Sequence, residues 1–145
     1  MSSPRTYAII GCGMMGREHM RNIALVEGAE LVAIIDPDAE SRDEALAQAK
    51  ALGQSVTVFD DSEDMLAKAK PDAVIVASPN FTHFDVVKPV MEAGCAVLLE
   101  KPMCTTVEDA LALARQVRDY ETLYWVGHEY RFMPPVTRFT ERVHA

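Results

Sequence analysis

The stretch that most constrains this fold joins a short apolar run to a helix through three glycines. Tyr7–Ile10 has the pattern of a buried strand, Gly11, Gly13 and Gly16 follow with the spacing G-x-G-x-x-G, and a helix pattern runs from about Met15 to Val26. Gly11 would permit a tight turn, Gly13 would let the backbone approach a diphosphate, and Gly16 would let helix and strand pack closely. The free N–H groups that begin the helix would hold the phosphate charge. We therefore predict dinucleotide binding here; the alternative is a purely structural turn.

Asp36 supports the dinucleotide interpretation by its position. It closes the next predicted strand, Leu31–Ile35, about 20 residues after Gly16, where the dinucleotide fingerprint has its acidic residue. Its carboxylate would accept hydrogen bonds from the adenosine ribose and repel a 2′-phosphate, which favours NAD over NADP. Arg42 is close enough in sequence to complicate this preference. The alternative role for Asp36 is to cap the following helix, which Asp38 could do equally well.

Strand and helix patterns alternate along the chain. The predicted strands are Tyr7–Ile10, Leu31–Ile35, Val56–Phe59, Ala73–Ala77, Ala96–Leu99 and Leu123–Val126. Helices are predicted over about 15–26, 39–52, 62–70, 80–93 and 107–120, with a last amphipathic segment from Pro134 to His144. This alternation predicts an α/β fold: a doubly wound parallel sheet of six strands with helices on both faces, in the order 3-2-1-4-5-6 of the Rossmann fold. We expect Pro89 to kink or break its helix, and Thr105 or Thr106 to cap the helix that starts at Val107.

Length, charge and cysteines limit the class of protein. The 145 residues suggest one domain, and no apolar run or leader indicates a membrane span or secretion. A net charge of −8 argues against nucleic-acid or anionic-membrane partners. Cys12, Cys95 and Cys104 lack the spacing of a metal site, and we expect them to be core residues of a protein in the reducing cytoplasm.

Ligands of open parallel sheets bind beyond the carboxyl ends of the strands. That edge should carry Ser78-Pro79-Asn80 and Glu100-Lys101-Pro102, besides the glycine turn and Asp36. Lys101, with its charge steadied by Glu100, could donate a hydrogen bond to a substrate hydroxyl or carbonyl and exchange a proton with it. The alternative is a salt bridge at the strand end.

Two histidines differ in what their positions suggest. His83 comes at the start of the helix that follows Asn80, and it could contact a nicotinamide or substrate; otherwise it is a surface histidine near the helix cap. His19 lies within the first helix among Met15, Met20 and Ile23, which favours a packed structural role.

With these residues in place, the chain resembles the N-terminal half of the glucose–fructose oxidoreductase/inositol dehydrogenase (Gfo/Idh/MocA) family. The resemblance rests on Gly11-Cys12-Gly13-Met14-Met15-Gly16, Ala77-Ser78-Pro79-Asn80 with His83, Glu100-Lys101-Pro102, and Val126-Gly127 with Arg131-Phe132 and Pro134. It implies an oxidoreductase that transfers a hydride between NAD(H) or NADP(H) and a sugar, inositol or related polyol. It also implies that Lys101 is catalytic, that the Lys101–Pro102 bond is cis, and that the nicotinamide lies near Ser78, Pro79, Asn80, His83 and Glu100.

The resemblance also leads us to expect a second domain that is absent from this chain. Family members continue into a second domain, which supplies a further catalytic histidine, most substrate contacts and usually the oligomer interface. We therefore expect residues 1–145 to be a dinucleotide-binding domain, with 128–145 as a tail leading toward an absent substrate domain. His128-Glu129-Tyr130 departs from the asparagine or arginine that many members have there. Alone, the chain should turn over little or nothing. The alternative is a stand-alone dinucleotide-binding module or partner subunit; S-adenosylmethionine is a less favoured ligand.

Overall fold

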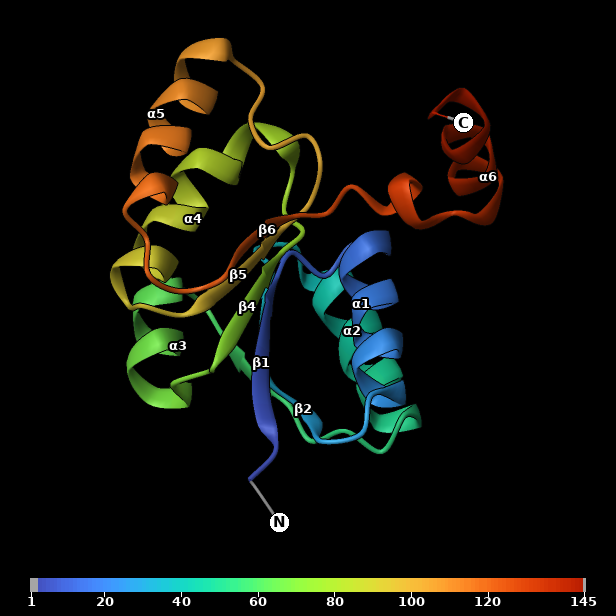
Figure 1. The fold of residues 1–145 in the computed structure, drawn as a ribbon. Coiled ribbons are helices and arrows are strands. Elements are labelled where there is room, and N and C mark those ends of the chain that lie inside the picture. The colour runs from blue at the N-terminus through green and yellow to red at the C-terminus, as the bar shows by residue number, and fades with distance from the viewer. Residues whose placement is uncertain (1–2, 145) are drawn as a thin grey trace.

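The six predicted strands form a single parallel sheet in the order β3-β2-β1-β4-β5-β6, which confirms the predicted fold class (Figure 1). The computed structural model describes residues 3–144. Its strands are β1 (Arg5–Ile10), β2 (Ala29–Ile35), β3 (Thr57–Phe59), β4 (Ala73–Val76), β5 (Ala96–Leu99) and β6 (Tyr124–Val126). The order reverses between β1 and β4, so the carboxyl ends of these two strands flank the crevice in which such sheets bind ligands.

Helices cover both faces of the sheet. They are α1 (Met14–Leu25), α2 (Ala39–Ala51), α3 (Ser62–Ala69), α4 (His83–Glu92), α5 (Val107–Arg118) and α6 (Pro134–His144), with short 3-10 turns at Asn80–Thr82 and Glu129–Phe132. Helices α1 and α2 lie on one face, and α3, α4 and α5 on the other (Figure 1). Helix α6 lies apart from both layers, and every residue from 128 to 144 is exposed.

Strand β1 shows why the central strands are apolar at nearly every position. Ile9 packs with Met20 and Ile34 in the core beneath α1 and α2, whereas Ala8 and Ile10 pack with Val74 in the core beneath the other three helices. Because successive side chains of a strand point to opposite faces, a strand covered on both faces has no position left for a polar residue.

One part of the sheet is not covered in this way. An apolar hollow of about 430 Å³ lies over β4, β5 and β6 on the face that α1 and α2 occupy elsewhere, with Ile75, Leu98 and Trp125 among its lining. The Trp125 side chain is 47% exposed and stands against Phe132 with the ring centroids 5.9 Å apart.

The structure corrects the expected break at Pro89. Helix α4 runs through Pro89 from His83 to Glu92, and the irregular backbone lies before it, in the 3-10 turn Asn80–Thr82. The helix that we predicted to start at Asn80 therefore becomes α-helical only at His83. The Ala93 N–H donates to the Pro89 carbonyl at 3.0 Å, so the turn after the proline keeps its hydrogen bond.

Thr106, rather than Thr105, caps α5. We therefore expect substitutions of the two threonines to differ in their effect on the free energy of unfolding. Its hydroxyl accepts from the Asp109 N–H at 3.1 Å and donates to the Asp109 carboxylate at 2.7 Å. Thr106→Ala should lower the free energy of unfolding by about 1 kcal/mol, because it leaves the Asp109 N–H without its side-chain partner. Thr105→Ala is the matched control and should change it by less than about 0.5 kcal/mol. Urea titrations of both variants measure the difference, and equal losses would contradict the capping assignment.

Candidate functional site

Four strand ends meet at one groove of about 880 Å³, a volume typical of ligand sites. The groove lies at the carboxyl ends of β1, β2, β3 and β4 and is closed by the first turns of α1 and α4. Its lining comprises Ile10, Gly11, Gly13, Met14, Met15, Ile35, Asp36, Pro37, Asp38, Ser41, Asp60, Asp61, Ser62, Ala77, Ser78, Pro79, Phe81, Thr82 and Val86. The groove thus contains most of the residues that the sequence assigns to a dinucleotide.

The glycine turn is wedged between α1 and β4. Gly11 has φ +98°, and a Cβ atom there would lie 2.4 Å from the Ser78 nitrogen, so only glycine fits. A Cβ atom on Gly16 would lie 1.9 Å from the Gly11 carbonyl oxygen. At Gly13, by contrast, an added Cβ atom meets nothing within 4 Å. Two glycines are therefore required by packing, and the third faces the open groove.

Helix α1 begins without a protein cap. Gly13 is its N-cap and offers no side-chain oxygen, and the first turn contains no acidic residue. Helices α2, α3 and α5 instead begin with Asp38, Asp61 and Thr106, whose side chains accept hydrogen bonds from N–H groups of the first turn. The first-turn N–H groups of α1 and its positive dipole end thus face the groove, as in helices that bind phosphate.

Asp36 holds the glycine turn and faces the groove. Its Oδ2 accepts from the Cys12 N–H at 2.6 Å and its Oδ1 from the Asp38 N–H at 2.9 Å. It does not cap α2, because Asp38 does so by accepting from the Ser41 N–H at 2.8 Å. Each carboxylate oxygen has further acceptor capacity, so a ribose hydroxyl could still donate to Asp36.

Arg42 lies beside Asp36 but is engaged by the backbone. Its Nη1 donates to the carbonyls of Asp36 and Pro37 at 2.7 and 3.1 Å. The guanidinium is thereby held at the end of β2, where its remaining N–H groups could meet a nucleotide.

The opposite wall of the groove is a small network of hydroxyl groups. Thr82 Oγ1 donates to the Pro79 carbonyl at 2.8 Å and lies 2.7 Å from Ser78 Oγ. Ser78, Pro79, Phe81 and Thr82 all line the groove, whereas Asn80, between them, is exposed and does not. A cofactor role for Asn80 stays a prediction.

The Lys101 segment lies beyond the groove lining. Lys101 follows Glu100 at the end of β5, its side chain is exposed, and among residues 3–144 it has no ion pair. The salt bridge that was the alternative role for Lys101 is therefore absent from the described part of the chain. The bond between Lys101 and Pro102 is cis, as the resemblance implies.

Glu100 has a different partner from the one we expected. Glu100 is buried, with only 7% of the residue exposed. Its Oε1 lies 2.8 Å from His19 Nε2, and its Oε2 accepts a hydrogen bond from the Lys101 backbone N–H at 3.2 Å. His19 is thus packed, as predicted, but it also contacts the segment that carries the catalytic candidate.

His83 does not lie in the groove. Its side chain is 0% exposed, with Nδ1 at 2.8 Å from the Pro102 carbonyl oxygen and Nε2 at 3.0 Å from that of Ser78. Neither a nicotinamide contact nor the alternative of a surface histidine fits this position, because both ring nitrogens already face backbone oxygens in the core.

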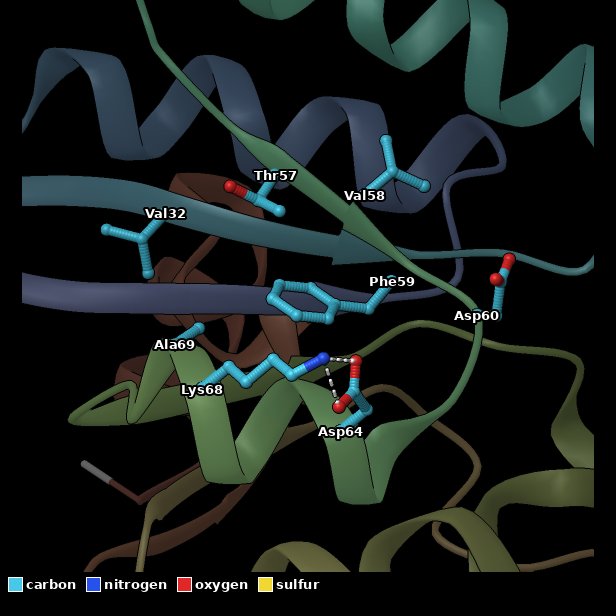
Figure 2. Close-up of a pocket in the computed structure, with 8 residues that line it drawn as sticks. All are labelled: Val32, Thr57, Val58, Phe59, Asp60, Asp64, Lys68 and Ala69. Carbon is cyan, nitrogen blue, oxygen red and sulfur yellow. Dashed lines mark hydrogen bonds and ion pairs between the residues drawn. The ribbon is translucent and has the colours of Figure 1, made fainter.

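A second hollow, of about 580 Å³, lies between the edge strand β3 and α3 (Figure 2). Two of its three charged residues pair with each other: Lys68 and Asp64 face one another across one turn of α3, with the Lys68 nitrogen 2.7 Å from an Asp64 oxygen. The hollow has no glycine turn and no uncapped helix terminus, so we assign the functional site to the groove.

Residues 3–144 contain neither a candidate metal site nor a candidate membrane span. No group of three histidine, cysteine or acidic residues is placed to hold a metal ion. None of the helices combines the length and hydropathy that crossing a bilayer would require.

Comparison with known proteins decides the family. The model of the Gfo/Idh/MocA family, described as an oxidoreductase family with an NAD-binding Rossmann fold, matches residues 5–128. The chain belongs to this family. It is the NAD-binding Rossmann domain of that family, which confirms the resemblance drawn from the glycine turn and Glu100-Lys101-Pro102.

Individual relatives support this and cover the chain almost completely. The chain is 39% identical to inositol 2-dehydrogenase 1 of Saccharopolyspora erythraea, covering 87% of this chain and 37% of that protein. It is 35% identical to D-glucoside 3-dehydrogenase of Escherichia coli, covering 98% and 40%. The crystal structure of myo-inositol dehydrogenase from Lactobacillus casei with NAD(H) and myo-inositol matches with a TM-score of 0.84 at 26% identity, covering 97% and 41%. The chain thus spans about two fifths of the length of these Gfo/Idh/MocA proteins.

Sequence reasoning missed two parts of this Gfo/Idh/MocA site, the segment Asp60-Asp61-Ser62 and the contact that His19 makes. Asp60, Asp61 and Ser62 line the groove and could have been found, since they follow the third strand just as Asp36 follows the second. His19 is a polar residue three positions after Gly16, next to the buried stripe that Gly16, Met20 and Ile23 form on α1. A titratable side chain at that position was a signal for a buried polar partner.

In the glycine turn of this Gfo/Idh/MocA domain, we expect substitution of Gly16 to reduce stability and substitution of Gly13 to reduce NADH affinity. Gly16→Ala should lower the free energy of unfolding by about 3 kcal/mol, because the new methyl group would meet the Gly11 carbonyl. Gly13→Ala should cost about 1 kcal/mol or less, yet weaken NADH binding at least about tenfold, because the methyl group faces the groove where the backbone would approach the diphosphate. Urea unfolding and NADH titration measure both. Unchanged NADH affinity in Gly13→Ala would contradict the placement of the diphosphate.

The buried thiol next to Asp36 predicts chemical protection. Burial, and secondly the Asp36 charge, raise the pKa of Cys12 to about 12. At pH 8 Cys12 is therefore almost entirely in the thiol form, and the thiolate is the reactive form. In the folded chain iodoacetamide should label half-buried Cys104 first and Cys12 only after unfolding, as peptide mass spectrometry would show. Equal labelling rates for Cys12 and Cys104 would contradict the buried thiol.

Proposed function

We propose that this chain is the cofactor domain of an enzyme that transfers a hydride between NAD and a sugar, an inositol or a related polyol. The observation that carries the proposal is the uncapped first turn of α1, which opens onto a groove bounded by Asp36 on one side and Ser78 on the other. Relatives named for inositol and glucoside oxidation support the substrate class.

The residues of the groove divide the work of holding NAD. The first-turn N–H groups of α1 would hold the diphosphate, with Gly13 giving it room. Asp36 would accept from the adenosine ribose hydroxyls. The nicotinamide would then lie along Ser78 and Pro79, toward the Lys101 segment. Bound NAD would supply the hydride acceptor.

Lys101 would act on the substrate as general base and acid. When a substrate alcohol is oxidised, the hydrogen on the carbon that bears the hydroxyl leaves as hydride to NAD, and the neutral Lys101 amine takes the O–H proton. In the reverse reduction the Lys101 ammonium returns that proton to the oxygen. The exposed side chain, free of a charged partner among residues 3–144, is available for this. In the complete enzyme Lys101→Met should lower kcat at least about a hundredfold and change the dissociation constant of NADH by less than about threefold. Steady-state kinetics and NADH titration decide, and equal losses in both would reduce Lys101 to a cofactor ligand.

The Asp36 carboxylate leads us to propose NAD rather than NADP as the preferred cofactor. A 2′-phosphate would meet a carboxylate that is fixed by the Cys12 and Asp38 N–H groups and cannot turn away. Arg42 opposes this effect but is engaged by two backbone carbonyls. The chain should therefore bind NADH at least about tenfold more tightly than NADPH, a difference of about 1.4 kcal/mol. Parallel fluorescence titrations measure both constants; equal affinities would contradict the role of Asp36.

We also propose that residues 1–145 act as one dinucleotide-binding domain and that 128–145 leads toward a substrate domain. The exposed apolar face of α6, with Val136, Phe139 and Val143, supports this assignment, as does the share of its relatives that the chain spans. The chain alone should bind NADH without measurable polyol oxidation, because hydride transfer needs a substrate held at about 3–3.5 Å from the cofactor. NADH binding without turnover in the complete protein would favour the stand-alone module.

The free thiols of Cys12, Cys95 and Cys104 support a reducing cytoplasm as the location of the protein.

A further inference from the structure

Two histidines from opposite faces of the sheet hold the two ends of the Glu100-Lys101-Pro102 segment. His19 belongs to α1 and contacts Glu100, whereas His83 begins α4 and contacts Pro102. Helices α1 and α4 cover different faces of the sheet (Figure 1). Lys101 is therefore the residue between two anchored neighbours, each fixed by an imidazole.

Lys101 depends on these anchors because its own side chain has none. Its ammonium group is exposed and forms no hydrogen bond or ion pair within residues 3–144, and a lysine stem is flexible. The position of the Lys101 backbone then determines which space the amine can reach. That backbone is held on one side by the Glu100 carboxylate, which accepts from the Lys101 N–H at 3.2 Å. On the other side it is held by the contact between the Pro102 carbonyl and His83.

The His19 contact connects this segment to the phosphate-binding helix. His19 lies one turn after Gly16 on α1, and its Nε2 is 2.8 Å from Glu100 Oε1. Gly127 packs against the same carboxylate, since a Cβ atom there would lie 3.4 Å from Oε1. Any shift of α1 relative to β5 would therefore be passed to Glu100 and to the Lys101 N–H.

The His83 contact connects the segment to the wall of the groove. One imidazole ring lies between the Pro102 carbonyl oxygen, at 2.8 Å, and the Ser78 carbonyl oxygen, at 3.0 Å. Ser78 lines the groove along which we place the nicotinamide. At 0% exposure the ring has no room to turn to solvent, so the spacing between Ser78 and Pro102 is fixed by the width of an imidazole.

We propose that His19 and His83 are positioning residues that place the Lys101 amine beside the bound dinucleotide. This proposal rests on the catalytic role of Lys101 under the proposed function. His19 sets the segment relative to the diphosphate end of the groove, and His83 sets it relative to the nicotinamide wall. Neither ring touches the cofactor or the substrate.

The test observes the Lys101 amine directly in the 145-residue chain. Reductive methylation with 13C-formaldehyde labels the five lysines, and Lys101→Arg identifies the Lys101 resonance. NADH should shift this resonance in the unsubstituted chain. His83→Leu and His19→Leu should abolish the shift while NADH still binds within about threefold of its original affinity. His83→Gln and His19→Gln, which keep an N–H donor, should restore most of it.

A matched control separates positioning from loss of stability. Tyr120→Phe removes the hydrogen bond from the Tyr120 hydroxyl to the Cys95 carbonyl, another side-chain anchor at the opposite end of β5. It should lower stability and leave the Lys101 shift unchanged. Where a leucine variant does not fold, the asparagine variant of the same histidine replaces it. Asparagine keeps a polar group in the core, but its amide is too short to span the contact, so this variant should also lose the Lys101 shift.

The outcomes distinguish this inference from the function on which it rests. If NADH leaves the Lys101 resonance of the unsubstituted chain unmoved, the placement of Lys101 at the cofactor is wrong and both proposals fall. If NADH shifts it equally in the unsubstituted chain and in both the His19 and His83 variants, the positioning role is overturned and the proposed function stands. Loss of the shift in Tyr120→Phe as well would also overturn it.

Discussion

The close contact between α1 and the glycine turn is the constraint on which the rest of the site depends. Gly16 lies against the Gly11 carbonyl, and Gly11 lies against the backbone of Ala77 and Ser78, in both cases too closely for a side chain. The end of β1 is thereby fixed between α1 and β4. This contact aims the uncapped turn of α1 into the groove, and it also brings His19 within reach of Glu100 on β5. One packing contact thus places both the turn at which we propose that the diphosphate binds and the histidine that contacts Glu100.

The buried carboxylate of Glu100 connects helix α1 to the Lys101 segment. Glu100 is an acid in a nearly water-free position, which is costly unless its oxygens are paired. Both are: one with His19, the other with the Lys101 N–H. The Glu100 oxygens are thus paired inside the protein, whereas the Lys101 side chain is exposed. Within residues 3–144 Lys101 has no charged partner, as the proton exchange that we propose for its amine requires.

The sequence was sufficient to predict the sheet, because the buried strands are apolar at nearly every position and caps such as Asp38 and Thr106 mark helix starts. It was not sufficient for the histidines. Whether His83 faces the groove or the core depends on the 3-10 turn at Asn80–Thr82, which rotates the start of α4, and no residue pattern fixes that rotation. Pro89 misled for a related reason: proline removes one N–H and favours a break, but packing of Val87 and Val90 in the core keeps the helix intact.

The distribution of charge in the groove explains how an acidic chain can bind an anionic dinucleotide. The net charge of −8 would repel phosphates at long range, but salt screens exposed charges beyond about 8–10 Å. At short range the groove is divided. Asp36, Asp38, Asp60 and Asp61 lie toward β2 and β3, whereas the first turn of α1 contains no acid. A dinucleotide placed with its diphosphate at α1 and its ribose hydroxyls at Asp36 meets a donor or an acceptor at each point, and the reversed placement brings phosphate against carboxylates. The acids that make the chain negative would therefore also select the proposed orientation, in which the nicotinamide points toward Ser78 and Lys101.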